Sequence, residues 1–540
     1  MDVCRSASDP KRCLDVFREL KNPYYIGDNV ALTQTCGWLD AWTAQPSAYA
    51  VAAQQTSDIV AAVNFARENN LRLVTKGGGH SYLGTSNAAD SLMIWTRAMN
   101  HITVHDAFVG RDCERHQAPT SAATIGPGAI WLQAYRDVTT KAGRYVQGGG
   151  CATVGVVGLV LGGGFGSYSK NFGTAAASLL EAEVVTADGA VRIANACTNP
   201  ELFWALKGGG GGTFGIVTRV TLRTHELPRL FGFAAMTIRA SSDGAFRRLL
   251  DRFMRLYADS LHNRHWGEIV NVKPNNILDV QMSFQGLDNQ QASALWQPFL
   301  KWIDDGGRDF TFTLPPRIVA IPAQQRWDTD FIRSRAPAAI VADDRPGAPS
   351  SSIFWSTNLS EAGHFIYAYA SVWLPGALLR KDLQTRLVDA LISAARYSTV
   401  ELHFQKGLAG GSAEALGATK ETSTNPAVTD AFALAIVGSE GPPAFPGLPG
   451  HEPALRSARE NARHVAQARQ ELGRIAPDGA SYVAESDYFL PDWPRSYWGS
   501  NYSKLLAIKK KYDPDGLFFV RHGVGSEDWS DDGFTRAPRS

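Results

Sequence analysis

The chain has 540 residues, a length that predicts two to four compact domains. Its 53 Lys and Arg residues balance 52 Asp and Glu residues, so the net charge of +1 provides no field that would attract nucleic acid or an anionic membrane. With 44% apolar and 19% charged residues, the composition excludes disordered and fibrous proteins. No run of 18 apolar residues occurs, so we expect a soluble protein with no nucleic-acid and no membrane partner.

Helix and strand patterns alternate in the first 225 residues. Thr56, Ser57 and Asp58 can cap a helix whose apolar positions follow at near-helical spacing. The apolar stretch at 71–74 predicts a strand that leads directly into the glycines before His80. Further strands are expected at 92–95, 183–186 and 216–222. This half is therefore predicted to be a mixture of helices and strands.

A second domain is predicted after about residue 225, where alternating patterns become prominent. Phe365, Tyr367, Tyr369, Ser371 and Trp373 share one face of a strand, with smaller apolar residues between them. The favoured interpretation is that this aromatic face packs on helices, and the alternative is that it walls a substrate site. Similar patterns predict strands at 269–273 and 432–437, a loop at 438–453 and a helix at about 452–473.

Glycine is concentrated in four runs within the first 215 residues, at 77–79, 148–150, 162–164 and 208–212. Glycine allows positive φ angles and close approach to the backbone, at an entropic cost. Tight turns would explain any single run. Four runs together favour a backbone that wraps around a large ligand.

The six cysteines include no C-x-x-C pair and no neighbouring histidine at metal-ligand spacing, so no metal site is expected. Four of them lie at the N-terminus or in polar, loop-like segments, which would suit disulfides in an oxidising compartment. The first twenty residues lack the apolar stretch of a signal peptide. We expect a secreted or periplasmic protein if a leader has been removed, and a cytoplasmic location stays open.

One histidine and one cysteine stand next to the glycine runs. His80 follows residues 77–79, and Cys151 follows residues 148–150. Backbone amides of such loops can cradle a pyrophosphate. A nearby Cys and His indicate either thiol catalysis or covalent attachment of a cofactor, whereas an ordinary loop position is the alternative for each alone.

These two segments closely resemble the FAD-linked oxidases of the vanillyl-alcohol oxidase superfamily, in the berberine-bridge-enzyme-like group. The resemblance continues through the motifs at 202–217, 497–502 and 508–518. It implies a bicovalent FAD, with His80 bonded to the 8α-methyl carbon and Cys151 to C6 of the ring. The further cofactor-binding positions that it implies are Gly77, Gly78, Gly79, Ser81, Gly84, Thr153, Val154, Gly155, Gly158, Gly163, Gly164, Gly166, Gly215, Ile216, Val217, Asn501 and Tyr502.

The resemblance also implies an α+β fold. Residues 1–225 would form a two-subdomain PCMH-type FAD-binding domain, and residues 226–480 an antiparallel-sheet substrate domain backed by helices. Residues 481–540 would be a C-terminal berberine-like segment that completes the FAD domain. We expect a monomer.

Tyr482 matches the tyrosine that removes the hydroxyl proton in family members that oxidise alcohols, with Tyr82 as the other candidate. The family's Tyr-x-Asn pattern is broken by Ala484, so another group must orient Tyr482. Lys406 would stabilise a phenolate if it lies close, and a surface lysine is the alternative. Leu159 replaces a histidine that many members place near the ribityl chain. The alkaloid-forming members use a strand glutamate that residues 430–436 lack.

The leading hypothesis is an oxidase that takes hydride from a CH–OH donor (a sugar, an oligosaccharide or another alcohol) and passes the electrons to O2, giving H2O2. The segment at 91–96 also resembles members described as alcohol oxidases. Val154 is small, and in this family a small side chain there goes with reactivity toward O2. The alternatives are a natural-product tailoring oxidase that forms C–C or C=C bonds, a dehydrogenase with another acceptor, and a flavin-binding protein without turnover.

Overall fold

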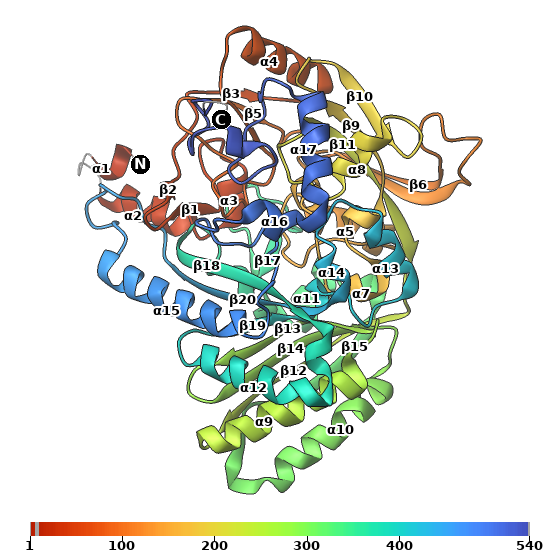
Figure 1. Cartoon of the computed structure of the whole chain (residues 1–540), viewed down its shortest axis with the longest axis vertical. Coiled ribbons are helices and arrows are strands. Elements are labelled where there is room, and N and C mark those ends of the chain that lie inside the picture. The colour runs from red at the N-terminus through yellow and green to blue at the C-terminus, as the bar shows by residue number, and fades with distance from the viewer. Residues whose placement is uncertain (1, 6–9, 538–540) are drawn as a thin grey trace.

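We describe the protein from a computed structural model, in which residues 2–5 and 10–537 are described. The N-terminal half and the C-terminal segment lie together at the top of Figure 1, and helices of the middle segment form its lower edge. The N-terminal helices are α1 (Asp2–Arg5), α2 (Pro10–Glu19) and α3 (Pro23–Gly27).

A small parallel sheet carries the first glycine run. Its strands lie in the order β3 (Tyr49–Ala52), β5 (Leu92–Trp95) and β4 (Leu73–Lys76), and α4 (Thr56–Glu68) packs on them. The carboxylate of Asp58 accepts hydrogen bonds from two backbone N–H groups before the helix, which stabilises its start. The predicted helix is confirmed, and the strand predicted at 71–74 begins two residues later.

A larger antiparallel sheet completes this half of the chain. Its strands run in the order β10 (Val191–Asn195), β9 (Leu179–Val185), β11 (Ile216–Glu226), β7 (Thr120–Ile125) and β6 (Ile102–Phe108), and β8 (Arg144–Val146) pairs with the end of β11. Its short helices are α5 (Trp131–Tyr135), α6 (Val156–Leu161), α7 (Ser169–Phe172) and α8 (Pro200–Leu206). Ile216 packs in the core of the small sheet and Val217 in the core of the larger one, so β11 joins the two subdomains.

The middle of the chain forms a third sheet. Its order is β15 (Phe310–Pro322), β12 (Leu230–Ala240), β14 (Ile277–Gln285), β13 (Trp266–Lys273), β19 (Val400–His403), β20 (Ala431–Gly441), β18 (His364–Pro375), β1 (Thr35–Trp38) and β2 (Trp42–Thr43). Neighbouring strands are antiparallel except β1 with β18. Because β1 and β2 come from the N-terminal segment, this sheet extends beyond the range 226–480 expected for its domain.

One face of this sheet is covered by helices, which gather in the lower part of Figure 1: α9 (Asp243–Leu256), α10 (Asn289–Asp305), α12 (Lys381–Ala395) and, beside β18, α15 (Leu455–Gly473). The remaining helices and strands of this half are α11 (Thr329–Arg335), β16 (Ile340–Ala342), β17 (Ile353–Trp355), α13 (Ala413–Lys420) and α14 (Ala427–Asp430). The loop predicted at 438–453 is shorter, because β20 continues to Gly441 and α15 begins at Leu455.

The aromatic residues of β18 do not share one face, because a bulge between Ile366 and Ala368 interrupts the strand. Phe365 and Tyr367 pack in a cluster with Ala458 and Ala462 of α15, as the favoured interpretation expects.

Beyond the bulge, Ala370 and Val372 pack in the core under the helices. Tyr369 instead lies 5.2 Å from Tyr82 of the glycine loop, measured between ring centroids, and Trp373 packs in a cluster with Tyr482. The smaller residues face the helices because they allow the helices to approach the sheet closely.

The C-terminal segment returns to the first half of the chain. It contains α16 (Trp493–Trp498) and α17 (Tyr502–Tyr512). The indole N–H of Trp498 donates to the carbonyl of Gly208 at 3.0 Å, and the buried ammonium of Lys509 donates to the carbonyl of Thr213 at 2.7 Å. The helices and the parallel and antiparallel sheets together form the expected α+β fold.

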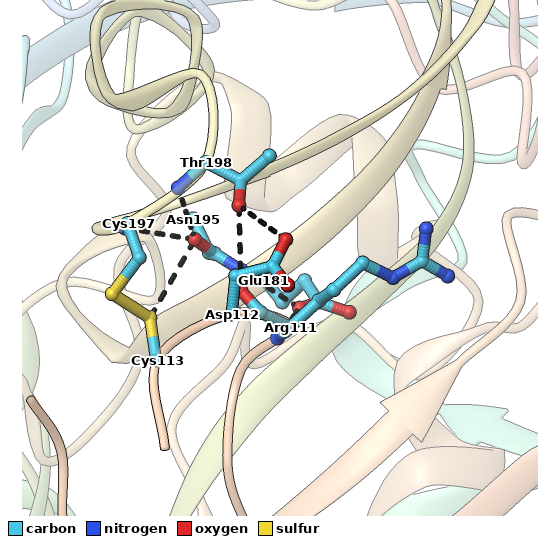
Figure 2. The surroundings of a disulfide bond; sticks show 7 residues. All are labelled: Arg111, Asp112, Cys113, Glu181, Asn195, Cys197 and Thr198. Carbon is cyan, nitrogen blue, oxygen red and sulfur yellow. Dashed lines mark hydrogen bonds between the residues drawn. A yellow bond between two sulfur atoms is a disulfide. The ribbon is translucent and has the colours of Figure 1, made fainter. Parts of the chain in front are cut away.

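Two disulfides join cysteines of the first half, Cys4 with Cys13 and Cys113 with Cys197. Figure 2 shows Cys113–Cys197 beside Asn195, whose amide oxygen accepts hydrogen bonds from the backbone N–H groups of Cys197 and Thr198. This disulfide ties the loop between β6 and β7 to the end of β10. Cys36 and Cys151 are free thiols.

Replacing Cys113 and Cys197 with alanine is expected to lower the free energy of unfolding by about 4 kcal/mol, because the bond closes a loop between residues 84 apart. Urea unfolding of the wild type and the double variant under oxidising conditions measures this. The Cys4→Ala and Cys13→Ala double variant is the control, because that disulfide closes a loop between residues only 9 apart and should contribute less. A Cys113 and Cys197 double variant as stable as the wild type would contradict the prediction.

Within residues 2–5 and 10–537, no helix is both long and apolar enough to cross a bilayer. In the same part of the chain, no group of three or more His, Cys, Asp or Glu side chains is placed to bind a metal ion.

Candidate active site

The first glycine run leads from the end of β4 to His80. Gly79 has a φ of +73°, which a side chain would strain. A β-carbon added to Gly78 would lie 2.7 Å from the backbone nitrogen of Gly155. The glycines therefore let this loop lie directly on the segment that follows Cys151.

His80 and Cys151 meet at one hydroxyl, although 71 positions separate them in the sequence. The Nε2 atom of His80 lies 3.2 Å from Oγ1 of Thr153, and the sulfur of Cys151 lies 3.9 Å from the same oxygen. The structure thus brings both predicted attachment residues together. Thr153 is buried between them.

Burial determines the protonation of both groups. Desolvation, with a smaller contribution from His364, lowers the pKa of His80 to about 3, so its imidazole is neutral at physiological pH. Desolvation raises the pKa of Cys151 to about 12, and the nearby Glu361 carboxylate acts in the same direction. Hydrogen bonds from Thr153 and Val154 oppose that rise by favouring the thiolate.

The substrate-domain sheet contributes Glu268 beside the Cys151 loop. Glu268 has a φ of +71° within β13, and its carboxylate accepts hydrogen bonds from Ser167 and, at 3.2 Å, from Gln405. A β-carbon on Gly150 would lie 3.7 Å from this carboxylate. Sequence analysis missed this glutamate, because no motif near residue 268 indicates its left-handed backbone and because its partners Ser167 and Gln405 are distant in the sequence.

Tyr482 lies against the third glycine run. Its hydroxyl accepts a hydrogen bond from the backbone N–H of Gly164 at 3.3 Å, and its ring meets Phe165 edge-on at 5.0 Å. Its own backbone N–H donates to the hydroxyl of Ser371 on β18. Gly164 and these packing contacts orient Tyr482, in place of the asparagine that Ala484 replaces.

Lys406 is buried, so the alternative of a surface lysine was wrong. Its ammonium donates to both carboxylate oxygens of Glu485, at 2.7 and 2.5 Å, rather than to Tyr482. Burial first, and then the charge of Glu485, raise the pKa of Tyr482 above its usual value of about 10. Lys406 counters the second effect by neutralising Glu485.

Tyr82, the other catalytic candidate, faces the substrate-domain sheet. Its ring lies 5.4 Å from that of His364, which bonds Glu440 and Thr35. Burial raises the pKa of Tyr82 well above its usual value, with carboxylates adding to the effect. Tyr82 is therefore a phenol at neutral pH.

The other predicted cofactor positions fall into three groups, of which the one at 215–217 lies at the start of β11, where the two subdomains join. Those at 77–84 and 153–166 surround the His80–Cys151–Tyr482 region, where Leu159 fills the space between Gly149 and Gly164. The amide of Asn501 donates to the carbonyl of Thr424, whose methyl group contacts Gly163 and Gly208. Tyr502 lies farther along the C-terminal segment, where its hydroxyl bonds Glu527 and Gly525.

These residues fit a covalently held flavin. A neutral imidazole and a thiol are the two nucleophiles that a double attachment needs, and both reach one hydroxyl. Gly158 is exposed on α6, and a β-carbon added there would meet no atom within 4 Å, which leaves room for a ligand beside the glycine runs. The donor set therefore agrees with the expected cofactor.

Comparisons with known proteins identify the family of the chain. Residues 47–195 match the family described as FAD binding domain, and residues 481–525 match the family described as berberine and berberine like. The chain is 30% identical over 516 residues to the VAO-type flavoprotein oxidase VAO615 of Thermothelomyces thermophilus, covering 91% of this chain and 78% of that protein. It is 30% identical over 493 residues to the FAD-linked oxidoreductase easE of Arthroderma benhamiae, covering 89% of each.

Solved structures share the fold. The VAO-type flavoprotein MtVAO615 from Myceliophthora thermophila C1 has a TM-score of 0.71 at 26% identity, covering 90% of this chain and 82% of that one. Glucooligosaccharide oxidase from Acremonium strictum, described with a 6-S-cysteinyl, 8α-N1-histidyl FAD, has a TM-score of 0.68 at 21% identity, covering 94% and 95%.

The fold and the site define an FAD-dependent oxidoreductase with a PCMH-type FAD-binding domain. More specifically, the chain belongs to the VAO-type flavoproteins, in their berberine-like group.

Proposed function

We propose that the protein is an oxidase with FAD bonded to His80 and Cys151, which oxidises a CH–OH donor and reduces O2 to H2O2. The observation that carries this proposal is the position of Tyr482. The hydroxyl of its buried phenol accepts a hydrogen bond from the backbone N–H of Gly164. Gly164 belongs to the glycine run at 162–164, which follows Cys151 in the same segment of chain. A phenol at that place supports proton removal from an alcohol next to the flavin.

The FAD would supply the hydride acceptor, and the residues of the chain would handle the proton. After losing its own proton to solvent, Tyr482 hydrogen-bonds the substrate hydroxyl as a phenolate and takes the hydroxyl proton as the carbon is oxidised. Its raised pKa keeps it protonated at rest, so proton transfer needs help from its surroundings. Lys406 provides this help by cancelling the charge of Glu485, which otherwise disfavours a phenolate.

The sheet beside Tyr482 favours a hydroxyl-rich substrate. Ile436 on β20 packs with Tyr482. Directly opposite Ile436 on the next strand, β19, is Glu401, and the strands beyond place Asn271 (β13) and Asp279 (β14) in the same row. Neighbouring strands lie about 4.8 Å apart, so the side chains of this row are spaced by about that distance across the sheet. The carboxylate of Asp279 also gathers donors from Thr237, Asn271, Lys273 and Gln281. Of these groups, the partly exposed carboxylate of Glu401 is the one that supports a hydroxyl-rich substrate such as a sugar over an apolar one.

A second candidate is the tailoring oxidase, and Glu268 favours it. A carboxylate at the Cys151 loop, on a substrate-domain strand, could serve as the base for C–C or C=C bond formation. A reaction that uses Glu268 as its base would not require the hydroxyl of Tyr482.

Anaerobic mixing with a panel of sugars, oligosaccharides, primary alcohols and aromatic alcohols tests the two functions. Bleaching of the flavin by a sugar, with a carbonyl or lactone product, supports the oxidase. Bleaching only by an apolar aromatic substrate, with a new C–C or C=C bond in the product, contradicts it.

Val154→Leu is expected to lower the rate of flavin reoxidation by O2 at least about tenfold while anaerobic reduction is retained. Val154 is half-buried at the site, and one added methylene can fill the space that O2 needs. Stopped-flow mixing of the reduced enzyme with aerated buffer measures this, with Val157→Leu, one turn away on α6, as the control. A wild type that reoxidises no faster than free reduced flavin would be a dehydrogenase.

We also propose that the protein matures in an oxidising compartment, as a secreted or periplasmic monomer. The two disulfides support this location. Equal free-thiol counts before and after reduction would contradict it.

A further inference from the structure

Thr153 contacts both residues that are proposed to hold the cofactor. Its hydroxyl lies 3.2 Å from Nε2 of His80 and 3.9 Å from the sulfur of Cys151. Its side chain is only 5% exposed, so water does not compete for these contacts. The hydroxyl has one hydrogen to donate and two lone pairs to accept with, which is what two different neighbours require.

The contact with His80 selects one form of the imidazole. A neutral imidazole carries a hydrogen on one nitrogen and a lone pair on the other, and the hydrogen bond of one nitrogen determines which is which. The side-chain hydrogen bond of His80 is made by Nε2 to the hydroxyl of Thr153, and the backbone of Thr153 also hydrogen-bonds the imidazole. If Nε2–H donates to Thr153, the lone pair of Nδ1 remains free to form a bond.

The contact with Cys151 concerns the hydrogen of the Thr153 hydroxyl. Once the oxygen of Thr153 accepts from His80, its own hydrogen points away from the ring and is available to the sulfur. A donated hydrogen bond favours the thiolate, the form of cysteine that forms bonds. The burial that disfavours this thiolate is thus opposed by the same hydroxyl.

We propose that Thr153 is the positioning residue for flavin attachment: it accepts the Nε2–H of His80, so that Nδ1 bonds the 8α carbon, and it donates to the sulfur of Cys151. This inference rests on the proposed double attachment. Each attachment exchanges a C–H bond of the flavin for a C–N or C–S bond. The carbon and the His80 or Cys151 side chain release one proton each, and O2 takes the two electrons and two protons as H2O2.

The experiment compares Thr153→Val, which keeps the shape and removes the hydroxyl, with Thr153→Ser, which keeps the hydroxyl. Thr218→Val is the matched control, because Thr218 is also buried and its hydroxyl bonds Glu183 away from the site. Each full-length protein is digested, and the flavin-bearing peptides of His80 and Cys151 are quantified by mass spectrometry. The linked nitrogen is identified by NMR of the isolated histidyl-flavin.

In the wild type we expect linkage through Nδ1. Thr153→Val should lower the His80-linked fraction at least about tenfold, as losses of histidine-orienting partners commonly do, or move the linkage to Nε2. It should also lower the Cys151-linked fraction. Thr153→Ser and Thr218→Val should remain within about twofold of the wild type. A Thr153→Val protein with the wild-type extent and isomer of linkage overturns the proposal.

A second measurement needs no variant of Thr153. In wild-type protein produced without riboflavin and labelled with ¹⁵N-histidine, the signal of His80, assigned by its loss in His80→Ala, reports which ring nitrogen carries the hydrogen before attachment. A hydrogen on Nδ1 overturns the proposal, and a hydrogen on Nε2 supports it. Wild-type protein without any covalent flavin contradicts the proposed double attachment itself, whereas linked wild type with a normal Thr153→Val contradicts only the role of Thr153.

Discussion

Tyr482→Phe is expected to lower the rate of flavin reduction about 100-fold or more, the usual contribution of a positioned proton acceptor. The substitution removes only the hydroxyl that Gly164 holds, and the ring contacts with Phe165 and Trp373 remain. Substrate affinity should therefore change much less than the reduction rate. Anaerobic stopped-flow reduction over a range of substrate concentrations separates the two.

The pH dependence of the same reaction tests the charge around Tyr482. Because burial and Glu485 raise the pKa of Tyr482, the phenolate fraction is small at neutral pH and grows as the pH rises toward that pKa. The reduction rate should rise from pH 7 to pH 9 in the wild type and lose this dependence in Tyr482→Phe. Tyr397→Phe, at an exposed tyrosine outside this cluster, is the control. A Tyr482→Phe enzyme reduced at the wild-type rate would move the role to Tyr82.

Protein denatured in acid is expected to stay yellow, because its flavin is bonded to the chain through His80 and Cys151. Either single alanine variant should keep the flavin through the remaining bond, and the double variant should release all of it. Absorbance of the precipitate and of the supernatant measures the bound fraction. Cys36→Ala, which removes the other free thiol, should leave both bonds intact.

The same variants test the effect of attachment on the chemistry. Covalent substituents usually raise the redox potential of the ring, so each single variant should have a lower potential and a slower reduction rate than the wild type. Flavin that washes out of unfolded wild type, or that stays attached to the double variant, would contradict the assignment of both residues.

The sequence by itself determined the features that depend on a few neighbouring residues. The capping carboxylate of Asp58 and the strand pattern at Leu92–Trp95 match α4 and β5, because hydrogen bonding and side-chain periodicity act over a few neighbouring residues. The motifs around His80 and Cys151 indicated the family and its cofactor for the same reason, since each is a short stretch of chain.

Only the tertiary structure decided which distant segments meet. Tyr482 is oriented by Gly164, 318 positions earlier, and Glu268 lies beside Gly150 through a strained backbone within a strand. A bulge in β18 divided its aromatic residues between helix α15 and the glycine loop, and Lys406 paired with Glu485. Close packing of whole sheets and the pairing of buried charges decide such contacts, and neither is encoded in any one stretch of sequence.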